Sequence, residues 1–149
     1  MSGRPFGEGG VRGFLHTPGT PGGDGLVLTH GSGGNCEAPL LVAVGRAFED
    51  AGIAVLRCDL PFRQKRRYGA PSPSSAAADR AGLREAVEQL RRRVPERVFM
   101  GGQSYGGRQA SLLASEDPKL AAALYEGTKA ASYRRASGCG GFQPRRRRR

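Results

Sequence analysis

Ser104 stands at the centre of the pattern G-x-S-x-G, which runs from Gly102 to Gly106. This spacing is typical of a sharp strand-to-helix turn that presents a serine hydroxyl as a nucleophile. A side chain two residues before or after the serine would collide within such a turn, and glycine at both places removes the collision. The serine would also lie at a helix N-terminus, where developing negative charge is stabilised. The pattern therefore predicts a nucleophile elbow with Ser104 at the nucleophile position.

A second glycine-rich segment, His30-Gly31-Ser32-Gly33-Gly34, follows a brief apolar run well before the serine motif. Backbone N–H groups of such a turn can converge on an oxyanion. A phosphate-binding loop and a plain turn are the alternatives. The segment lacks the G-K-[ST] ending of a Walker motif and the third glycine of G-x-G-x-x-G, so the oxyanion interpretation is favoured.

Few side chains are available to assist these two motifs. The histidines are His16 and His30, and neither follows Ser104. For His30 a supporting role beside the turn is favoured over the role of a base. The three cysteines form no CxxC pair and no Cys/His spacing suited to zinc, so we expect no metal and no cofactor. Cys36 could lie at a helix N-terminus, but without a histidine partner an inert thiol is favoured.

Apolar periodicity predicts the elements that would position these residues. Brief runs rich in strand formers alternate with stretches whose apolar residues repeat every three or four positions. Strands are expected at 11–16, 26–29, 53–56 and 98–100 and from 120 to 124, helices at 37–51, 75–93 and 108–115, and a loop at 59–75. This alternation predicts an α/β fold in which a parallel sheet is flanked by helices on both faces.

The chain of 149 residues divides by composition into three parts. Residues 1–10 are expected to form a flexible N-terminus, 11–124 a partial domain and 125–149 a disordered tail that ends in five arginines. This tail holds eight basic residues and one acid, so most of the net charge of +11 lies there. A nucleic-acid partner is therefore expected through the tail or not at all. Because no signal peptide or membrane-spanning run is visible, a cytoplasmic location without a membrane partner is expected.

Three segments together resemble an α/β-hydrolase. They are Leu28–Gly34, Arg57–Arg63 and Gly102–Ala110, and the last two contain D-L-P-F-R and S-Y-G-G-R-Q-A. The resemblance covers about residues 11–124. It is greatest to the dienelactone-hydrolase-related branch typified by testis-expressed protein 30 and the hydrolase-like subunit of the non-specific-lethal complex.

This resemblance implies roles for particular residues. Ser104 would be the nucleophile of an ester or acyl hydrolase, with Gly102 and Gly106 as the glycines of the turn around it. The oxyanion hole would be formed by the backbone amide of Tyr105 and by those of the turn, which are the amides of Ser32, Gly33 and Gly34. His30 would support that turn.

The sequence departs from the family after Ser104. A hydrolase triad places an aspartate or glutamate and then a histidine after the serine, on loops that follow later strands. Here no histidine follows, and Asp117 comes too early to be the triad acid. We therefore expect a C-terminally truncated hydrolase domain that acts on a small ester or acyl substrate very weakly or not at all. The alternative is a non-catalytic interaction module that binds a protein partner, or acidic partners or nucleic acid through its basic tail.

Overall fold

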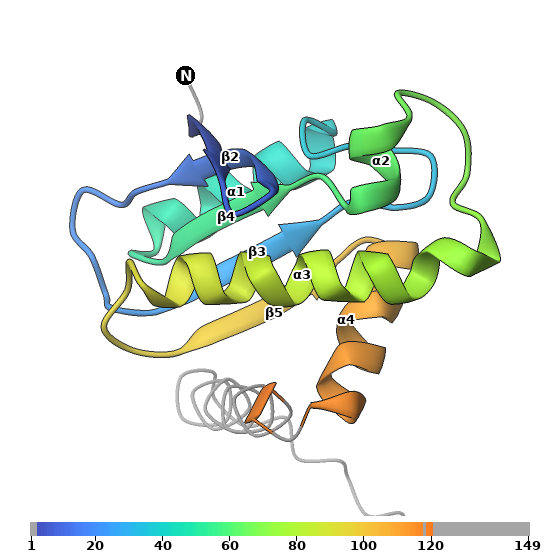
Figure 1. Ribbon diagram of the computed structural model, residues 1–149. Helices are drawn as coiled ribbons and strands as arrows, with labels where there is room; N and C mark the ends of the chain where they lie inside the picture. Colours follow the sequence, from blue (N-terminus) through green and yellow to red (C-terminus); the bar gives the residue numbers. More distant parts are fainter. Residues whose placement is uncertain (1–2, 118, 121–149) are drawn as a thin grey trace, which may run out of the picture.

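The computed structural model describes residues 3–117 and 119–120. Its strands form one open sheet in the order β1-β2-β4-β3-β5 (Figure 1). The strands are β1 (Arg4–Glu8), β2 (Val11–His16), β3 (Gly25–Thr29), β4 (Ala54–Cys58) and β5 (Val98–Gly102). The helices are α1 (Pro39–Asp50), α2 (Pro61–Lys65), α3 (Ala76–Arg91) and α4 (Tyr105–Glu116), and a 3₁₀ turn, η1 (Pro73–Ser75), precedes α3. The predicted α/β fold with flanking helices is confirmed.

The sheet is mixed, which corrects the expectation of a parallel sheet. β3 is parallel to β4 and β5, but β2 is antiparallel to β4 and β1 is antiparallel to β2. The β1–β2 hairpin turns at Gly9 and Gly10, whose φ angles of +59° and +76° suit a two-residue turn that glycine adopts without strain. Arg4–Glu8, expected within a flexible N-terminus, is therefore the edge strand of the sheet.

Helices cover both faces of the sheet, with α3 and α4 on one face and α1 on the other (Figure 1). The main core lies under α3, where the predicted stripe Leu83, Val87 and Leu90 is fully buried against Val27 and Leu56. Burial of one such side chain stabilises the fold by about 1.5–3 kcal/mol, so this face contributes much of the stability. A smaller cluster on the other face contains Leu26, Leu28 and Val55, with Val44 of α1 packed against it.

The helix expected at 37–51 is α1, but its predicted apolar stripe is only partly buried. Leu41 is 4% exposed, whereas Leu40 is 53% exposed and Phe48 is 40% exposed. The helix instead buries Gly45, where a Cβ would lie 3.0 Å from Nε2 of His16. A close approach that needs glycine is invisible to hydrophobic periodicity, which therefore identified the helix but not its buried face.

Two further expectations differ from the structure. α2 lies inside the segment 59–75 that was predicted to be a loop, and Pro61 occupies its first position, where proline is well tolerated. Leu120, expected to begin a strand, is helical. The rest of that predicted strand lies outside the described residues, as does the basic tail at 125–149. Within the described part of the chain, no helix is long and apolar enough to cross a lipid bilayer.

Candidate active site

Ser104 lies on the tight turn between β5 and α4. With a φ of 48° and a ψ of −110°, it is the one non-glycine residue with positive φ among residues 3–117 and 119–120. Such a conformation costs about 1–3 kcal/mol, and it persists only where the surrounding structure enforces it. The residue is exposed to solvent. The turn therefore presents the serine at the surface in a strained backbone.

Gly102 and Gly106 allow this turn to close. A Cβ on Gly102 would lie 2.5 Å from the backbone carbonyl carbon of Gly106, and one on Gly106 would lie 2.6 Å from the carbonyl oxygen of His30. Both distances are far below van der Waals contact, and rotation of a side chain cannot move a backbone atom away. The collisions predicted from the sequence motif thus have identified partners within this turn and the turn beside it.

The predicted oxyanion turn lies directly beside the serine. A Cβ on Gly31 would be 3.8 Å from the Cβ of Ser104, so the two segments are in contact. The Gly34 N–H donates to the carbonyl of Gly31 at 3.2 Å. This N–H is therefore not available as an oxyanion donor. Ser32 and Gly33 are exposed. Of the three predicted donors in this turn, the amides of Ser32 and Gly33 therefore remain as candidates.

His30 is fully buried, and backbone groups occupy both of its ring nitrogens. Nδ1 donates to the carbonyl of Gly31 at 2.8 Å, and Nε2 accepts from the N–H of Leu60 at 3.0 Å. Because a carbonyl can only accept and an N–H can only donate, these partners assign a neutral ring with its proton on Nδ1. Burial lowers the pKa of His30 and outweighs the attraction of Asp59, whose carboxylate lies 3.9 Å from Nε2. With both nitrogens engaged, the ring supports the turn.

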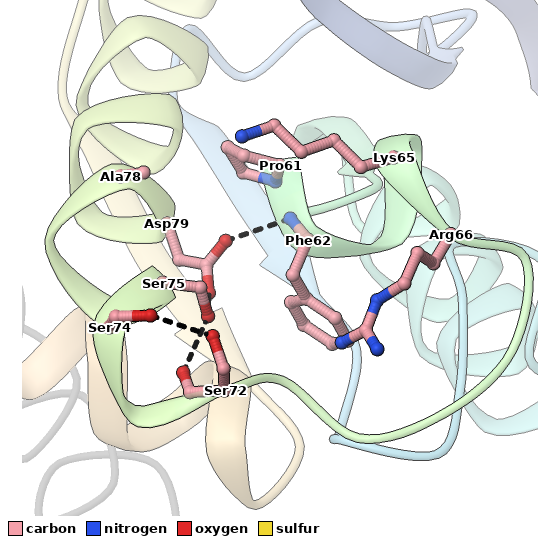
Figure 2. Close-up of a pocket in the computed structure, with 9 residues that line it drawn as sticks. All are labelled: Pro61, Phe62, Lys65, Arg66, Ser72, Ser74, Ser75, Ala78 and Asp79. Atoms are coloured by element: carbon pink, nitrogen blue, oxygen red, sulfur yellow. Dashed lines mark hydrogen bonds between the residues drawn. The ribbon is translucent and has the colours of Figure 1, made fainter.

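Asp79, on α3, binds the residue that follows the serine. One carboxylate oxygen accepts from the Tyr105 hydroxyl at 2.7 Å and from the Ser75 hydroxyl at 3.2 Å. The other accepts from the Phe62 N–H at 3.0 Å (Figure 2). Burial, together with the bond to Asp79, raises the pKa of Tyr105 to about 12. The N–H of Tyr105 lies in the first turn of α4, where N–H groups have no acceptor within the helix.

Aromatic contacts join the same elements. The ring of Phe62 meets the rings of His30 and Tyr105 edge-on, with centroids 5.5 Å apart in each pair. The turn after β3, α2, α3 and the start of α4 are therefore held together around Ser104.

Sequence reasoning missed Asp79 and Arg63. Arg63 is 4% exposed and donates to the carbonyl oxygens of Ser32 and Gly34 in the predicted oxyanion turn. Arg63 ends the D-L-P-F-R segment, but nothing in the sequence gives it a role, because it also begins a cluster of basic residues. Asp79 lies in the first turn of a helix, where an acid is common. Their roles can be recognised only when α2 is known to pack against the oxyanion turn.

No histidine within the described residues is placed to act as a base for Ser104. His16 is fully buried, with Nδ1 bonded to Glu49 at 2.8 Å and Nε2 accepting from Arg57 at 2.8 Å. Cys36 is buried, and burial raises the pKa of its thiol to about 12, so the thiol stays protonated at neutral pH. In the part of the chain that the structure describes, no group of three or more His, Cys, Asp or Glu residues could hold a metal ion.

Besides a pocket of about 520 Å³ lined by Asn35, Asp59 and Arg63 among others, two pockets adjoin these elements. One of about 530 Å³ lies between α2 and the start of α3, with the ring of Phe62 and the carboxylate of Asp79 in its wall (Figure 2). The other, of about 160 Å³, lies beside the elbow and is lined by Leu28, Leu40 and Gln103 with four further residues. Ser104 lines neither pocket. The smaller recess is mainly apolar and lies next to the residue that precedes the serine, so it could take a short aliphatic group.

Comparisons with known proteins agree on the fold. A family model described as an alpha/beta hydrolase domain matches residues 23–130. The dienelactone hydrolase of Anabaena variabilis is 25% identical, with a TM-score of 0.61, and the match covers 80% of this chain and 61% of that one. A protein from Thermus thermophilus is 26% identical, with a TM-score of 0.61 and coverage of 78% and 52%. An alpha-beta serine hydrolase homologue from Coxiella burnetii is 14% identical, with a TM-score of 0.60 and coverage of 77% and 57%.

The chain spans between 43% and 61% of the length of the solved structures it resembles. None of the curated proteins matches the sequence.

Proposed function

Because the chain belongs to the α/β-hydrolase family, we propose that it carries the nucleophile and the oxyanion-binding part of a serine hydrolase site. The observation that carries this proposal is the exposed Ser104, held at a φ of 48° between Gly102 and Gly106 and in contact with the turn at Gly31. Strain at an exposed serine serves a purpose when the hydroxyl must face a substrate.

We further assign the chain to the dienelactone-hydrolase-related branch that includes testis-expressed protein 30. The segments D-L-P-F-R and S-Y-G-G-R-Q-A support this assignment, as does the 25% identity to a dienelactone hydrolase. The substrates would be small esters or other acyl compounds, used without a cofactor, and the location would be cytoplasmic.

In the proposed reaction, Oγ of Ser104 attacks the carbonyl carbon of an ester. As the new C–O bond forms, negative charge develops on the carbonyl oxygen, where the N–H groups of Tyr105 and of Ser32 or Gly33 would stabilise it. A base must take the serine proton, and an acid must protonate the departing alkoxide. In this chain no histidine follows Ser104, and the nitrogens of His30 are engaged. This chain alone would therefore hydrolyse esters very weakly or not at all.

A serine-directed phosphonate probe followed by peptide mapping tests the assignment. We expect label at Ser104 that stays well below one equivalent per chain over hours, and no label after Ser104→Ala. Ser111→Ala is the matched control, because among the described residues that exposed serine bonds only the Gly107 carbonyl of its own helix. Labelling by one equivalent of the probe per chain within minutes would contradict the expected weak reactivity of Ser104. Label that persists after Ser104→Ala would overturn the nucleophile assignment.

A second candidate function is that of a non-catalytic interaction module. The concentration of charge in residues 125–149, eight basic residues against one acid, favours it. Binding to an acidic protein or to nucleic acid would then fall steeply with salt and disappear when residues 125–149 are deleted. Binding to RNA and DNA oligonucleotides and to an acidic peptide, measured by fluorescence anisotropy at two salt concentrations, checks this. Absent or salt-independent binding would exclude the module.

A further inference from the structure

Within the part of the chain that the structure describes, the guanidinium of Arg63 bonds only to backbone carbonyls. Nε donates to the Gly34 oxygen at 2.7 Å, and Nη2 donates to the Ser32 oxygen at 2.8 Å and to the Gly69 oxygen at 2.9 Å. Nη1 donates to the Arg66 oxygen at 3.2 Å. The group also lies over the ring of Phe62, 4.9 Å from its centroid. Among the described residues no carboxylate forms an ion pair with it.

These bonds fix the direction of peptide planes in the turn. In a trans peptide the C=O and the N–H of the following residue point in opposite directions. When Arg63 holds the Ser32 carbonyl, the Gly33 N–H must point away from the guanidinium. In the same way, His30 holds the carbonyl of Gly31, so the N–H of Ser32 points away from the imidazole.

We propose that Arg63 is a positioning residue for the oxyanion turn beside Ser104. It holds the carbonyls of Ser32 and Gly34 on one side and so turns the Gly33 N–H to the other, while His30 directs the N–H of Ser32. This inference rests on the proposed function, since an oxyanion forms only if position 104 attacks an acyl group.

Arginine suits this role better than lysine does. Its planar fork places several donors at fixed angles, and here they reach four carbonyl oxygens at once. A lysine ammonium is a compact point charge on a flexible stem and cannot fix two peptide planes in the same way.

The test replaces the serine by a nucleophile that needs no histidine. In a Ser104→Cys chain, the thiolate attacks 4-nitrophenyl acetate, a C–S bond forms, and a tetrahedral oxyanion appears. Its collapse breaks the C–O bond and releases 4-nitrophenolate, and the thiol proton has already passed to water. With iodoacetamide the same thiolate forms a C–S bond and expels iodide, and no oxyanion appears. The ratio of the acylation rate to the alkylation rate at position 104 therefore isolates oxyanion stabilisation from access and thiol reactivity.

Peptide mapping reads position 104 alone, so the native cysteines do not contribute. We expect the Ser104→Cys chain to show a ratio well above that of a cysteine peptide. Arg63→Gln and Arg63→Lys, each added to it, should lower the ratio by at least about tenfold while alkylation stays within about twofold. Arg67→Gln is the matched control, because that exposed arginine lies over Tyr68 at 5.6 Å, and the ratio should not change.

The outcomes separate the two proposals. A ratio no higher than that of the cysteine peptide in the parent Ser104→Cys chain would overturn the proposed function. A high parent ratio that neither Arg63 variant lowers would overturn the positioning role alone. Loss of acylation and alkylation in equal proportion would also overturn it, since that result reports a purely structural effect. Where circular dichroism shows that Arg63→Gln has unfolded, Arg63→Lys decides between these outcomes.

Discussion

The two glycine-rich segments beside Ser104 are shaped by opposite means. At the elbow, Gly102 and Gly106 are required because a Cβ at either position would strike backbone atoms at 2.5–2.6 Å. In the oxyanion turn, a Cβ on Gly33 would have no neighbour within 4 Å, and one on Gly34 would have none closer than 3.6 Å. The absence of side chains shapes the elbow, whereas hydrogen bonds from His30 and Arg63 hold the turn.

The contrast shows that glycine is sterically required in one of the two segments and not in the other. At the elbow, glycine is required because two backbone segments approach each other closely. In the turn, glycine indicates only that the chain bends there. The residues that define the turn are side chains that bond its carbonyls. A substitution should therefore have very different effects in the two segments.

The largest expected effect is that of Gly106→Ala. The new methyl group would lie 2.6 Å from the His30 carbonyl oxygen, so the backbone of the elbow or of β3 must shift. We expect a loss of about 3 kcal/mol or more in the free energy of unfolding, measured by urea denaturation. Gly33→Ala is the control, with a change within about 0.5 kcal/mol. Equal losses in both variants would erase the contrast between the segments.

A smaller effect is expected from acid, which should weaken the turn through His30. Burial lowers the pKa of His30 in the folded chain below its ordinary value of 6.5. Below pH 6.5 the unfolded chain therefore binds a proton at His30 that the folded chain does not bind. The contribution of His30 to the free energy of unfolding is full above pH 6.5 and falls as the pH drops below it. The slope should reach about 1.4 kcal/mol per pH unit while only the unfolded state is protonated.

Urea denaturation of the wild type and of His30→Gln between pH 7.5 and 5 measures this term. The difference between the two curves isolates His30, because every other ionisable group is present in both proteins. Parallel curves across this range would show that protonation of His30 does not oppose folding.

The smallest effect should come from relief of strain at the elbow. Ser104→Gly places glycine at a φ of 48°, where it has no Cβ penalty, and we expect stabilisation of about 1 kcal/mol. Ser104→Ala keeps the Cβ, and stability should stay within about 0.5 kcal/mol of the wild type. Thermal melts of both variants test this. A glycine variant no more stable than the alanine variant would show that the turn is not strained.

The sequence supported the elbow better than any other part of the site. The G-x-S-x-G pattern predicts a strand, a turn and a helix, and β5, Ser104 and α4 follow in that order. The role of Ser104 as nucleophile stays a prediction, as does the identity of the oxyanion donors. The local pattern sufficed for the turn itself because Gly102 meets the backbone of Gly106 and Gly107, only a few residues away, whereas the approach of Gly106 to Thr29 and His30 is a long-range contact.

Other features depended on contacts that no local pattern contains. Arg63 bonds carbonyls 29 and 31 residues earlier in the chain, and Asp79 bonds a tyrosine 26 residues later. The mixed sheet contains two antiparallel pairs, β1–β2 and β2–β4, and only the first had a signal in the sequence, which was Gly9-Gly10 between two short runs. Buried polar contacts of this kind become predictable only once the fold has placed the elements together.

Asp79 has a consequence for how this part of the molecule opens. Its carboxylate joins α2, the start of α3 and the first residue of α4, and Asp79 itself is fully buried. Separation of any one of these elements would leave a desolvated carboxylate with missing donors, which costs more than the loss of an exposed contact. The three elements should therefore open together as one cooperative unit in amide hydrogen exchange, and the backbone around Ser104 should share the protection of α3.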